Sequence, residues 1–157
     1  MSAMKKPRNE ALSLVNLLGI ALTLCGCATS SHQLLTWDGD KISNQELTEV
    51  LRQNPLAPKQ NIRITLLRQT ERASVHVVQV RTAEIPHVHQ THDLSVFVVR
   101  GYGTMVMGTE TKTVRAGDVI QVPAGVRHYF TNQSLTPSVA VVVFSPAFDG
   151  KDTVRTE

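Results

Sequence analysis

Apolar and polar side chains alternate along the chain from residue 62 onward, and this pattern limits the fold more than any other feature. It is clearest over residues 62–66 and 75–81. Because successive side chains of a β-strand point to opposite faces, the alternation predicts strands rather than helices. Further strands are expected where β-branched and aromatic residues gather between turn residues, over 95–99, 104–107, 112–114, 119–122, 127–132 and 139–144. Many short strands at close spacing predict an all-β sandwich or barrel.

One short helix is expected before these strands. Ser43 and Glu46 have the spacing of a capping box, and apolar residues follow them at helical spacing. Pro55 disfavours helical geometry in the residue before it. We therefore expect an N-terminal helix over 43–53, within a helix-and-loop segment over 43–61.

The first 26 residues have the parts of a bacterial signal peptide. A basic start precedes an apolar stretch over 11–24, which is shorter than the roughly 20 residues that a membrane-spanning helix needs. The stretch ends in Leu24-Cys25-Gly26-Cys27, which resembles the bacterial lipobox. The resemblance implies that residues 1–26 are removed and that Cys27 is the lipidation site, carrying a palmitate-type membrane anchor.

Residues 27–42 are then expected to form a lipidated tether. It would hold the folded part on the periplasmic side of the cell envelope. Ala28, rather than Asp, follows the cysteine, and this resembles lipoproteins of the outer membrane. No later segment is apolar enough to cross a bilayer.

Charge and cysteine content exclude two further classes of protein. Three of the 16 basic residues and one of the 13 acidic residues lie in the first ten positions, so the rest of the chain holds 13 basic and 12 acidic side chains. A nearly neutral body offers no electrostatic footprint for nucleic acid, which is not an expected partner. Both cysteines lie in the lipobox segment. The folded part therefore depends on an apolar core and not on disulfides.

Three histidines of the β-rich region are candidate metal ligands. His87 and His89 are two residues apart, so on a strand both rings point to the same face. His128 lies on a later strand and can meet them across a barrel. Neutral imidazole is the commonest metal ligand in proteins. The cofactor expected here is one divalent transition metal: Zn, Fe, Cu, Ni or Mn.

The residues around His128 resemble the second motif of the cupin family, G-x5-P-x-G-x2-H-x3-N. Gly117, Pro123, Gly125, His128 and Asn132 match it position by position. The resemblance implies a small jelly-roll β-barrel with a metal site in its interior.

The first cupin motif, G-x5-H-x-H-x3,4-E-x6-G, is matched in part. His87, His89 and Gly101 fit it, and Arg81 stands at the first Gly position. No Glu is present, because the position that the family gives to Glu holds Leu94.

The missing Glu leaves the fourth ligand open. Asp93 and His92 are both candidates for it, and a site of three histidines completed by water is a further alternative. Without a carboxylate, the site favours Zn, Cu or Ni over Mn. His32 and His76 lie outside the motifs and are expected at the surface.

The cupin resemblance covers residues 62–148, followed by a frayed C-terminal tail over 149–157. Since the fold hosts many activities, it does not select one. The leading hypothesis is a membrane-anchored lipoprotein whose metal-binding domain processes a small molecule by oxygenase- or isomerase-type chemistry, with no catalytic residue assigned. The alternatives are a non-catalytic module that binds or senses a small ligand or metal, and a structural lipoprotein. Cupins are often dimers, so the resemblance also allows a homodimer.

Overall fold

The computed structural model describes residues 32–157. The signal peptide expected over 1–26, the lipidation site Cys27 and the first part of the tether lie outside the described residues. Within 32–157, no helix is long and apolar enough to cross a membrane.

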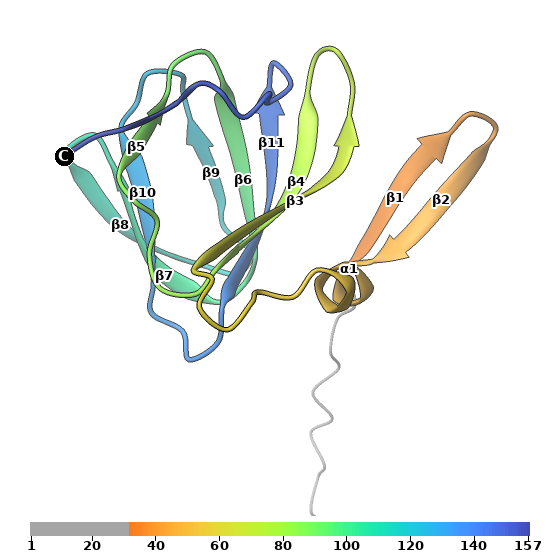
Figure 1. Cartoon of the computed structure of the whole chain (residues 1–157), viewed down its shortest axis with the longest axis horizontal. Helices are drawn as coiled ribbons and strands as arrows, with labels where there is room; N and C mark the ends of the chain where they lie inside the picture. Colours follow the sequence, from red (N-terminus) through yellow and green to blue (C-terminus); the bar gives the residue numbers. More distant parts are fainter. Residues whose placement is uncertain (1–31) are drawn as a thin grey trace, which may run out of the picture. The chain divides into compact units, whose positions relative to one another are not determined.

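Two antiparallel five-stranded sheets face each other (Figure 1). The first sheet has the order β12 (Thr153–Arg155), β5 (His87–His89), β10 (His128–Asn132), β7 (Tyr102–Met107) and β8 (Glu110–Arg115). The second has the order β3 (Ile62–Gln69), β4 (Ser74–Val80), β11 (Ser138–Ser145), β6 (Asp93–Arg100) and β9 (Val119–Val122). This arrangement is an all-β jelly roll, so the predicted fold class is confirmed.

The core between the sheets is made of the inward side chains of the alternating strands. Its buried members come from both sheets and are Val78, Val80, Leu94, Val98, Met105, Val114, Ile120, Val122, Val142 and Phe144. The period of two seen in the sequence therefore marks the faces that are removed from water.

A second apolar cluster covers the outer face of the β3–β4–β11–β6–β9 sheet. Helix α1 (Leu47–Gln53) packs Leu47 and Val50 against Val77 and Val139. Strand β4 is therefore buried on both faces, which explains why Val77 and Val78 interrupt its alternation.

His76 is buried and not at the surface, so that prediction is wrong. Its side chain lies on the inner face of β4, with its ring centroid 5.2 Å from that of Phe144. Because histidine is polar, the sequence alone suggests a surface position for it. Its strand parity with Val78, however, places it inside the barrel. His32 is exposed, as expected.

The helix begins later than the capping-box pattern predicts. Ser43 lies on strand β2 (Lys41–Glu46), opposite Thr36 of β1 (Gln33–Asp38). Glu46 is the N-cap residue of α1 but makes no side-chain capping hydrogen bond. The predicted start at residue 43 is therefore wrong, while the end at Gln53 is confirmed.

Residues 33–46 form a β-hairpin, whereas the sequence suggested a tether as far as residue 42. The hairpin turns at Asp38-Gly39-Asp40, where Gly39 has a φ of 72° that favours glycine. All side chains of β2 are exposed. No buried face therefore imposed an alternating pattern on β2.

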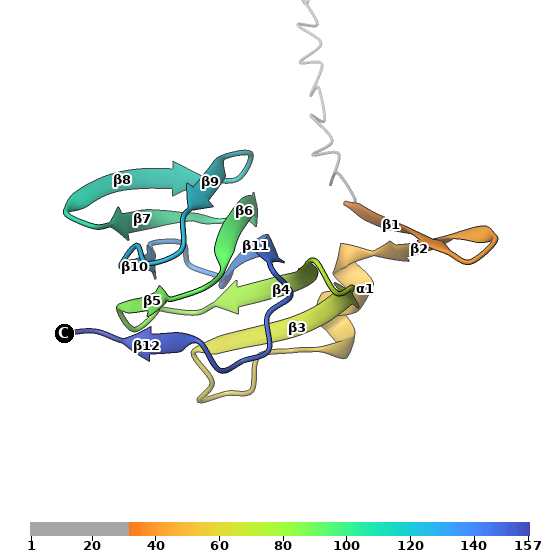
Figure 2. The ribbon, with the colours of Figure 1, turned by 90° about the horizontal axis from the view of Figure 1, so that it is seen from above.

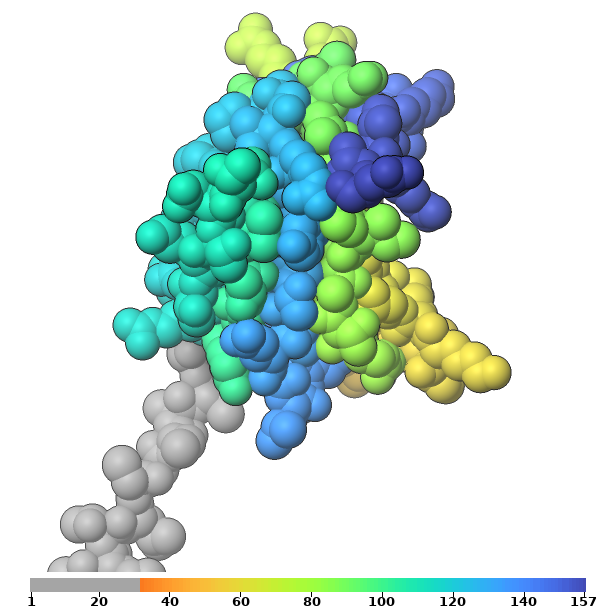
Figure 3. Space-filling view, turned by 90° about the vertical axis from the view of Figure 1, so that its left-hand side faces the viewer, coloured from red at the N-terminus to blue at the C-terminus, as the bar shows by residue number. Residues whose placement is uncertain are grey.

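The C-terminal residues are ordered against the barrel, so the prediction of a frayed tail over 149–157 is wrong. Strand β12 pairs with β5, placing Thr153 opposite His89 and Arg155 opposite His87. Figures 2 and 3 show this C-terminal segment running alongside β5. The last strand thus lies next to the candidate metal ligands.

Candidate metal centre

The three motif histidines come together on the inner face of the β12–β5–β10–β7–β8 sheet. His87 on β5 lies directly opposite His128 on β10, and His89 follows two residues later on the same face of β5. One ring nitrogen of each lies within 4.8 Å of the others. His89 and His128 are buried, and His87 is half-buried. The pairing of two strands far apart in sequence therefore builds the cluster.

Each of these rings has its Nδ1 occupied by an acceptor. The Nδ1 of His87 donates to the Ile85 carbonyl over 2.8 Å, and that of His128 donates to the Val126 carbonyl over 2.9 Å. The Nδ1 of His89 donates to Asp152 Oδ1 over 3.1 Å. Because carbonyl and carboxylate oxygens only accept, each Nδ1 carries the proton. In the neutral form, the Nε2 of each ring then has no proton and carries a lone pair that can bind a metal.

The surroundings also keep two of the rings neutral. Burial, together with the neighbouring His87 and His89, lowers the pKa of His128 to about 4, although the hydrogen bond to the Val126 carbonyl opposes the shift. Burial likewise lowers the pKa of His89, although its hydrogen bond to Asp152 opposes the shift. Metal ligation requires deprotonated imidazole nitrogens. The two rings therefore meet this requirement at neutral pH.

The fourth-ligand candidates His92 and Asp93 do not join the cluster. His92 presents its Nδ1 to Asp152 Oδ2 and its Nε2 to the Ala147 carbonyl. With two acceptors to satisfy, both ring nitrogens of His92 donate, so neither offers a lone pair. Asp93 is exposed, and its carboxylate accepts the Ala124 N–H over 2.8 Å.

Leu94, at the position that the cupin motif gives to Glu, is buried and lines the cavity beside the histidines. The arrangement thus corresponds to the alternative of three histidines without a protein carboxylate. A metal held by three ligands keeps a position open for water or a substrate.

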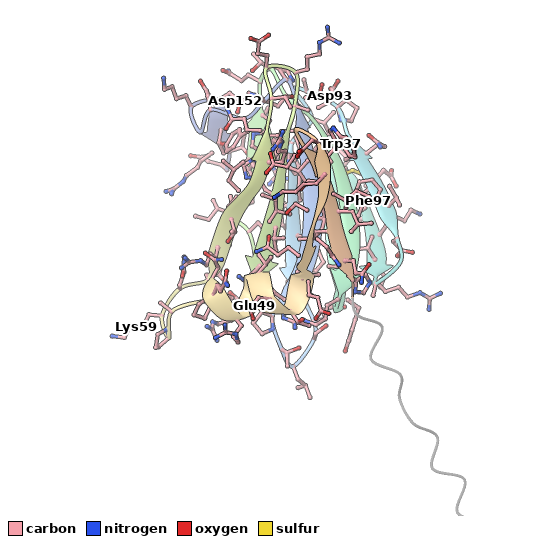
Figure 4. All side chains as sticks on the ribbon, turned by 90° about the vertical axis from the view of Figure 1, so that its right-hand side faces the viewer. Trp37, Glu49, Lys59, Asp93, Phe97 and Asp152 are labelled. Carbon is pink, nitrogen blue, oxygen red and sulfur yellow. The ribbon has the colours of Figure 1, made fainter. Side chains whose placement is uncertain are left out.

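Asp152 is a residue of the candidate site that the sequence did not reveal. It lies at the same end of the barrel as Asp93 (Figure 4). Besides the two histidines, it accepts hydrogen bonds from the backbone N–H and the hydroxyl of Thr91, over 3.2 and 3.1 Å. Burial opposes its ionisation, but the bonds from His92 and His89 hold the pKa of its carboxyl well below the ordinary value. Carboxylates that bond the second nitrogen of a ligating histidine orient its ring toward the metal.

His92 is held in place by the same carboxylate. Burial disfavours its charged form, yet its hydrogen bonds with Asp152 and the Ala147 carbonyl raise its pKa overall. His92 is therefore a hydrogen-bond partner of Asp152 and not a member of the cluster.

A cavity of about 260 Å³ lies in front of the three histidines. Its wall is mostly apolar. Glu84 is an acidic residue in this wall, and its Oε2 accepts the Phe130 N–H over 2.9 Å. Burial raises the pKa of the Glu84 carboxyl, and His87 nearby opposes part of that shift. Glu84 was not recognised in the sequence because it lies in a loop between Arg81 and His87, at a position of the first motif where any residue is allowed.

The donor set fits a divalent transition metal. Three convergent imidazole nitrogens without protons repel one another in an apolar cavity unless a cation lies between them. His87, His89 and His128 would hold the ion, and Asp152 would orient His89.

Comparison with known proteins is consistent with this geometry. The cupin-domain family matches residues 74–144. An uncharacterized protein of Aquifex aeolicus is 38% identical over 98 residues, which cover 62% of this chain and 80% of that protein. Acireductone dioxygenase of Bacillus subtilis is 39% identical over 61 residues, which cover 36% of this chain but only 34% of that enzyme.

A similar solved structure is that of Pac13, a nucleoside dehydratase from Streptomyces. It has 26% identity and a TM-score of 0.54, and the match covers 64% of this chain and 82% of that one.

The family match includes all three histidines and the strands between them. The family match and the relative from Aquifex, of which the match covers four fifths, show that the chain belongs to the cupin family.

Proposed function

We propose that this protein is a membrane-anchored bacterial lipoprotein whose cupin domain holds one divalent transition metal and uses it to process a small molecule. The anchor would be a lipid on Cys27, and the domain would lie in the periplasm, at the outer membrane. The convergence of three histidine nitrogens, each with its Nδ1 bonded to a protein acceptor, carries the metal part of the proposal.

A metal bound there supplies Lewis-acid or redox chemistry to a ligand in the cavity. The protein contributes the rest of the site. The apolar wall excludes bulk water, and the cavity that Leu94 helps to line leaves room for a ligand. Glu84 is placed to exchange a hydrogen bond or a proton with a ligand in the cavity.

The relative from Bacillus subtilis favours oxygenase-type chemistry among the possible activities, because that protein is a dioxygenase. The match spans about a third of the enzyme, so its substrate is not carried over. A non-catalytic role in binding or sensing is the second candidate. It is favoured by the cavity wall, which is apolar apart from a few groups and therefore suits retention of a ligand as well as its conversion.

The metal content of the full-length protein, purified from membranes in detergent, tests the proposal. The comparison uses the wild type, a His87→Ala/His128→Ala variant and a His32→Ala control, since His32 is exposed and outside the cluster. We expect about one equivalent of one transition metal in the wild type and the control. We expect none in the double variant.

Two results would contradict the proposal. One is a wild type that contains no metal even after reconstitution with Zn, Fe, Cu, Ni and Mn. The other is a double variant that keeps its metal while circular dichroism shows a folded barrel.

A further inference from the structure

Arg155 is an unpaired cation beside the histidine cluster. It lies on β12 directly opposite His87 on β5. Residues directly opposite each other on paired strands have their side chains on the same face, so Arg155 faces the same side as His87. Arg155 also lines the cavity in front of the histidines.

No acid neutralises this guanidinium. Across residues 32–157, the ion pairs involve other residues, and no carboxylate lies within 4.0 Å of Arg155. Glu84, an acid in the cavity wall, is bonded to the Phe130 N–H instead. A guanidinium at a cavity without a counter-charge attracts an anion, and it binds a carboxylate through two parallel hydrogen bonds.

Arg155 lies at the solvent-exposed side of the cavity. Among the residues lining the cavity, Ile64 and Ile85 are each 50% exposed and Arg155 is also exposed, whereas most of the others are buried or half-buried. Deeper in the cavity the wall is formed by side chains such as Val98, Met105 and Ile120. The cavity therefore has a guanidinium at its exposed side and a largely apolar wall at its buried side.

We propose that the ligand of this site is a small organic carboxylate whose acid group is bound by Arg155, whose apolar body fills the barrel, and whose second oxygen reaches the histidine-bound metal. The cavity of about 260 Å³ is smaller than the roughly 300–1,000 Å³ of sites for drug-sized ligands. The ligand is therefore a compact acid with an apolar body. This inference rests on the proposed function for its metal contact, but the contact with Arg155 stands on its own.

The test compares hexanoate with hexanamide, which have similar shapes but differ in charge. Binding to the full-length protein is followed by saturation-transfer NMR titration. The variants are Arg155→Gln, Arg155→Lys and the control Arg115→Gln, which removes an exposed arginine of β8 outside the cavity. Circular dichroism and metal content are recorded for every variant.

We expect hexanoate to bind about tenfold more tightly than hexanamide to the wild type and to Arg115→Gln. Arg155→Gln should abolish this preference, and Arg155→Lys should keep part of it, because lysine retains the charge but not the paired donors. Equal binding of the two probes to the wild type, binding of neither probe, or an unchanged preference in Arg155→Gln would each overturn the inference.

A third probe separates this inference from the proposed metal centre. 2-Oxohexanoate adds a second oxygen next to the acid group. It should bind more tightly than hexanoate to the wild type, and this advantage should disappear in His87→Ala/His128→Ala. A preference for hexanoate that depends on Arg155 in a metal-free wild type would uphold the anion site and refute the metal centre. Normal metal content without that preference would refute the anion site alone.

Discussion

Asp152 determines which nitrogen of His89 is available to a metal. Its Oδ1 accepts from Nδ1 of His89, which leaves Nε2 of that ring unprotonated. Asp152→Ala should weaken metal binding by about 10- to 100-fold, the usual effect of losing such a partner. Competition with a chromophoric chelator measures the affinity, and ¹⁵N NMR of the ring reports the tautomer. Asp149→Asn, an exposed change in the same segment, is the control.

Asp152→Asn refines this prediction, because its amide oxygen can still accept from His89 while the charge that faces His92 is lost. It should recover part of the affinity. An Asp152→Ala variant with wild-type affinity and an unchanged tautomer would show that Asp152 does not position the ring.

The buried histidines make the metal-free protein sensitive to acid. Burial lowers the pKa of His128 from its ordinary value of 6.5 to about 4. Between these values the unfolded chain binds more protons than the folded one, so the free energy of unfolding should fall as the pH falls from about 6.5 to 4. His89 and His76, whose pKa values burial also lowers, add to this loss.

His92 has the opposite effect on the pH dependence of the free energy of unfolding. Its pKa is raised overall, so it adds stability that is present below pH 6.5 and is lost as the pH rises through its folded value. Urea denaturation of the metal-free protein across this pH range measures the balance. His128→Gln should show a shallower loss of stability on acidification than the wild type. A wild type more stable at pH 4 than at pH 6.5 would contradict the prediction.

The contact between strands β7 and β10 depends on a glycine. Gly103 lies opposite Asn132, and a Cβ added to it would overlap the Thr131 carbonyl oxygen and come within 2.5 Å of Phe130 Cζ. Gly103→Ala should therefore destabilise the protein by about 1–3 kcal/mol, since neither the paired backbone nor the ring can move freely. The measurement is denaturant unfolding.

Gly108→Ala is the control for this element. It lies at the β7–β8 turn with a φ of 58° and has no neighbouring atom within 4 Å of an added Cβ. Its cost should be only the backbone strain of about 1–2 kcal/mol. If Gly103→Ala costs clearly less than Gly108→Ala, the close approach of the two strands is not a constraint.

The strands predicted from the sequence have buried or half-buried side chains on at least one face, because burial selects apolar and β-branched residues there. Strand β2 is exposed along its whole length, and β12 has only three residues, all exposed. Neither has a periodic signal. The Asp38-Gly39 turn was the one local indication of the β1–β2 hairpin.

The residues of the candidate site also divide into those that the sequence predicted and those that it did not. His87, His89 and His128 were predicted because their spacing and motif are local. Asp152 and Arg155 reach the site only because β12 pairs with β5, more than sixty residues earlier in the chain. Because β12 is short and exposed, its sequence has no pattern that predicts its pairing with β5.

At the scale of the whole molecule, the proposed anchor and the metal centre should be separable. Residues 32–157 form one compact unit, and it contains all three histidines of the cluster. The proposed lipid lies on Cys27, outside this unit. Cys27→Ser should therefore abolish lipidation and cleavage but leave the metal content unchanged.

Cys25→Ser is a matched control, because the two cysteines are two residues apart in the same motif and only Cys27 is the proposed nucleophile for the lipid. Mass spectrometry of intact protein from membranes should find residues 27–157 with acyl chains in the wild type and in Cys25→Ser. In Cys27→Ser it should find an unmodified chain that keeps residues 1–26. Acyl chains on Cys27→Ser, or a wild type that begins elsewhere without a lipid, would refute the anchor. The metal site would then belong to a protein held in its compartment by other means.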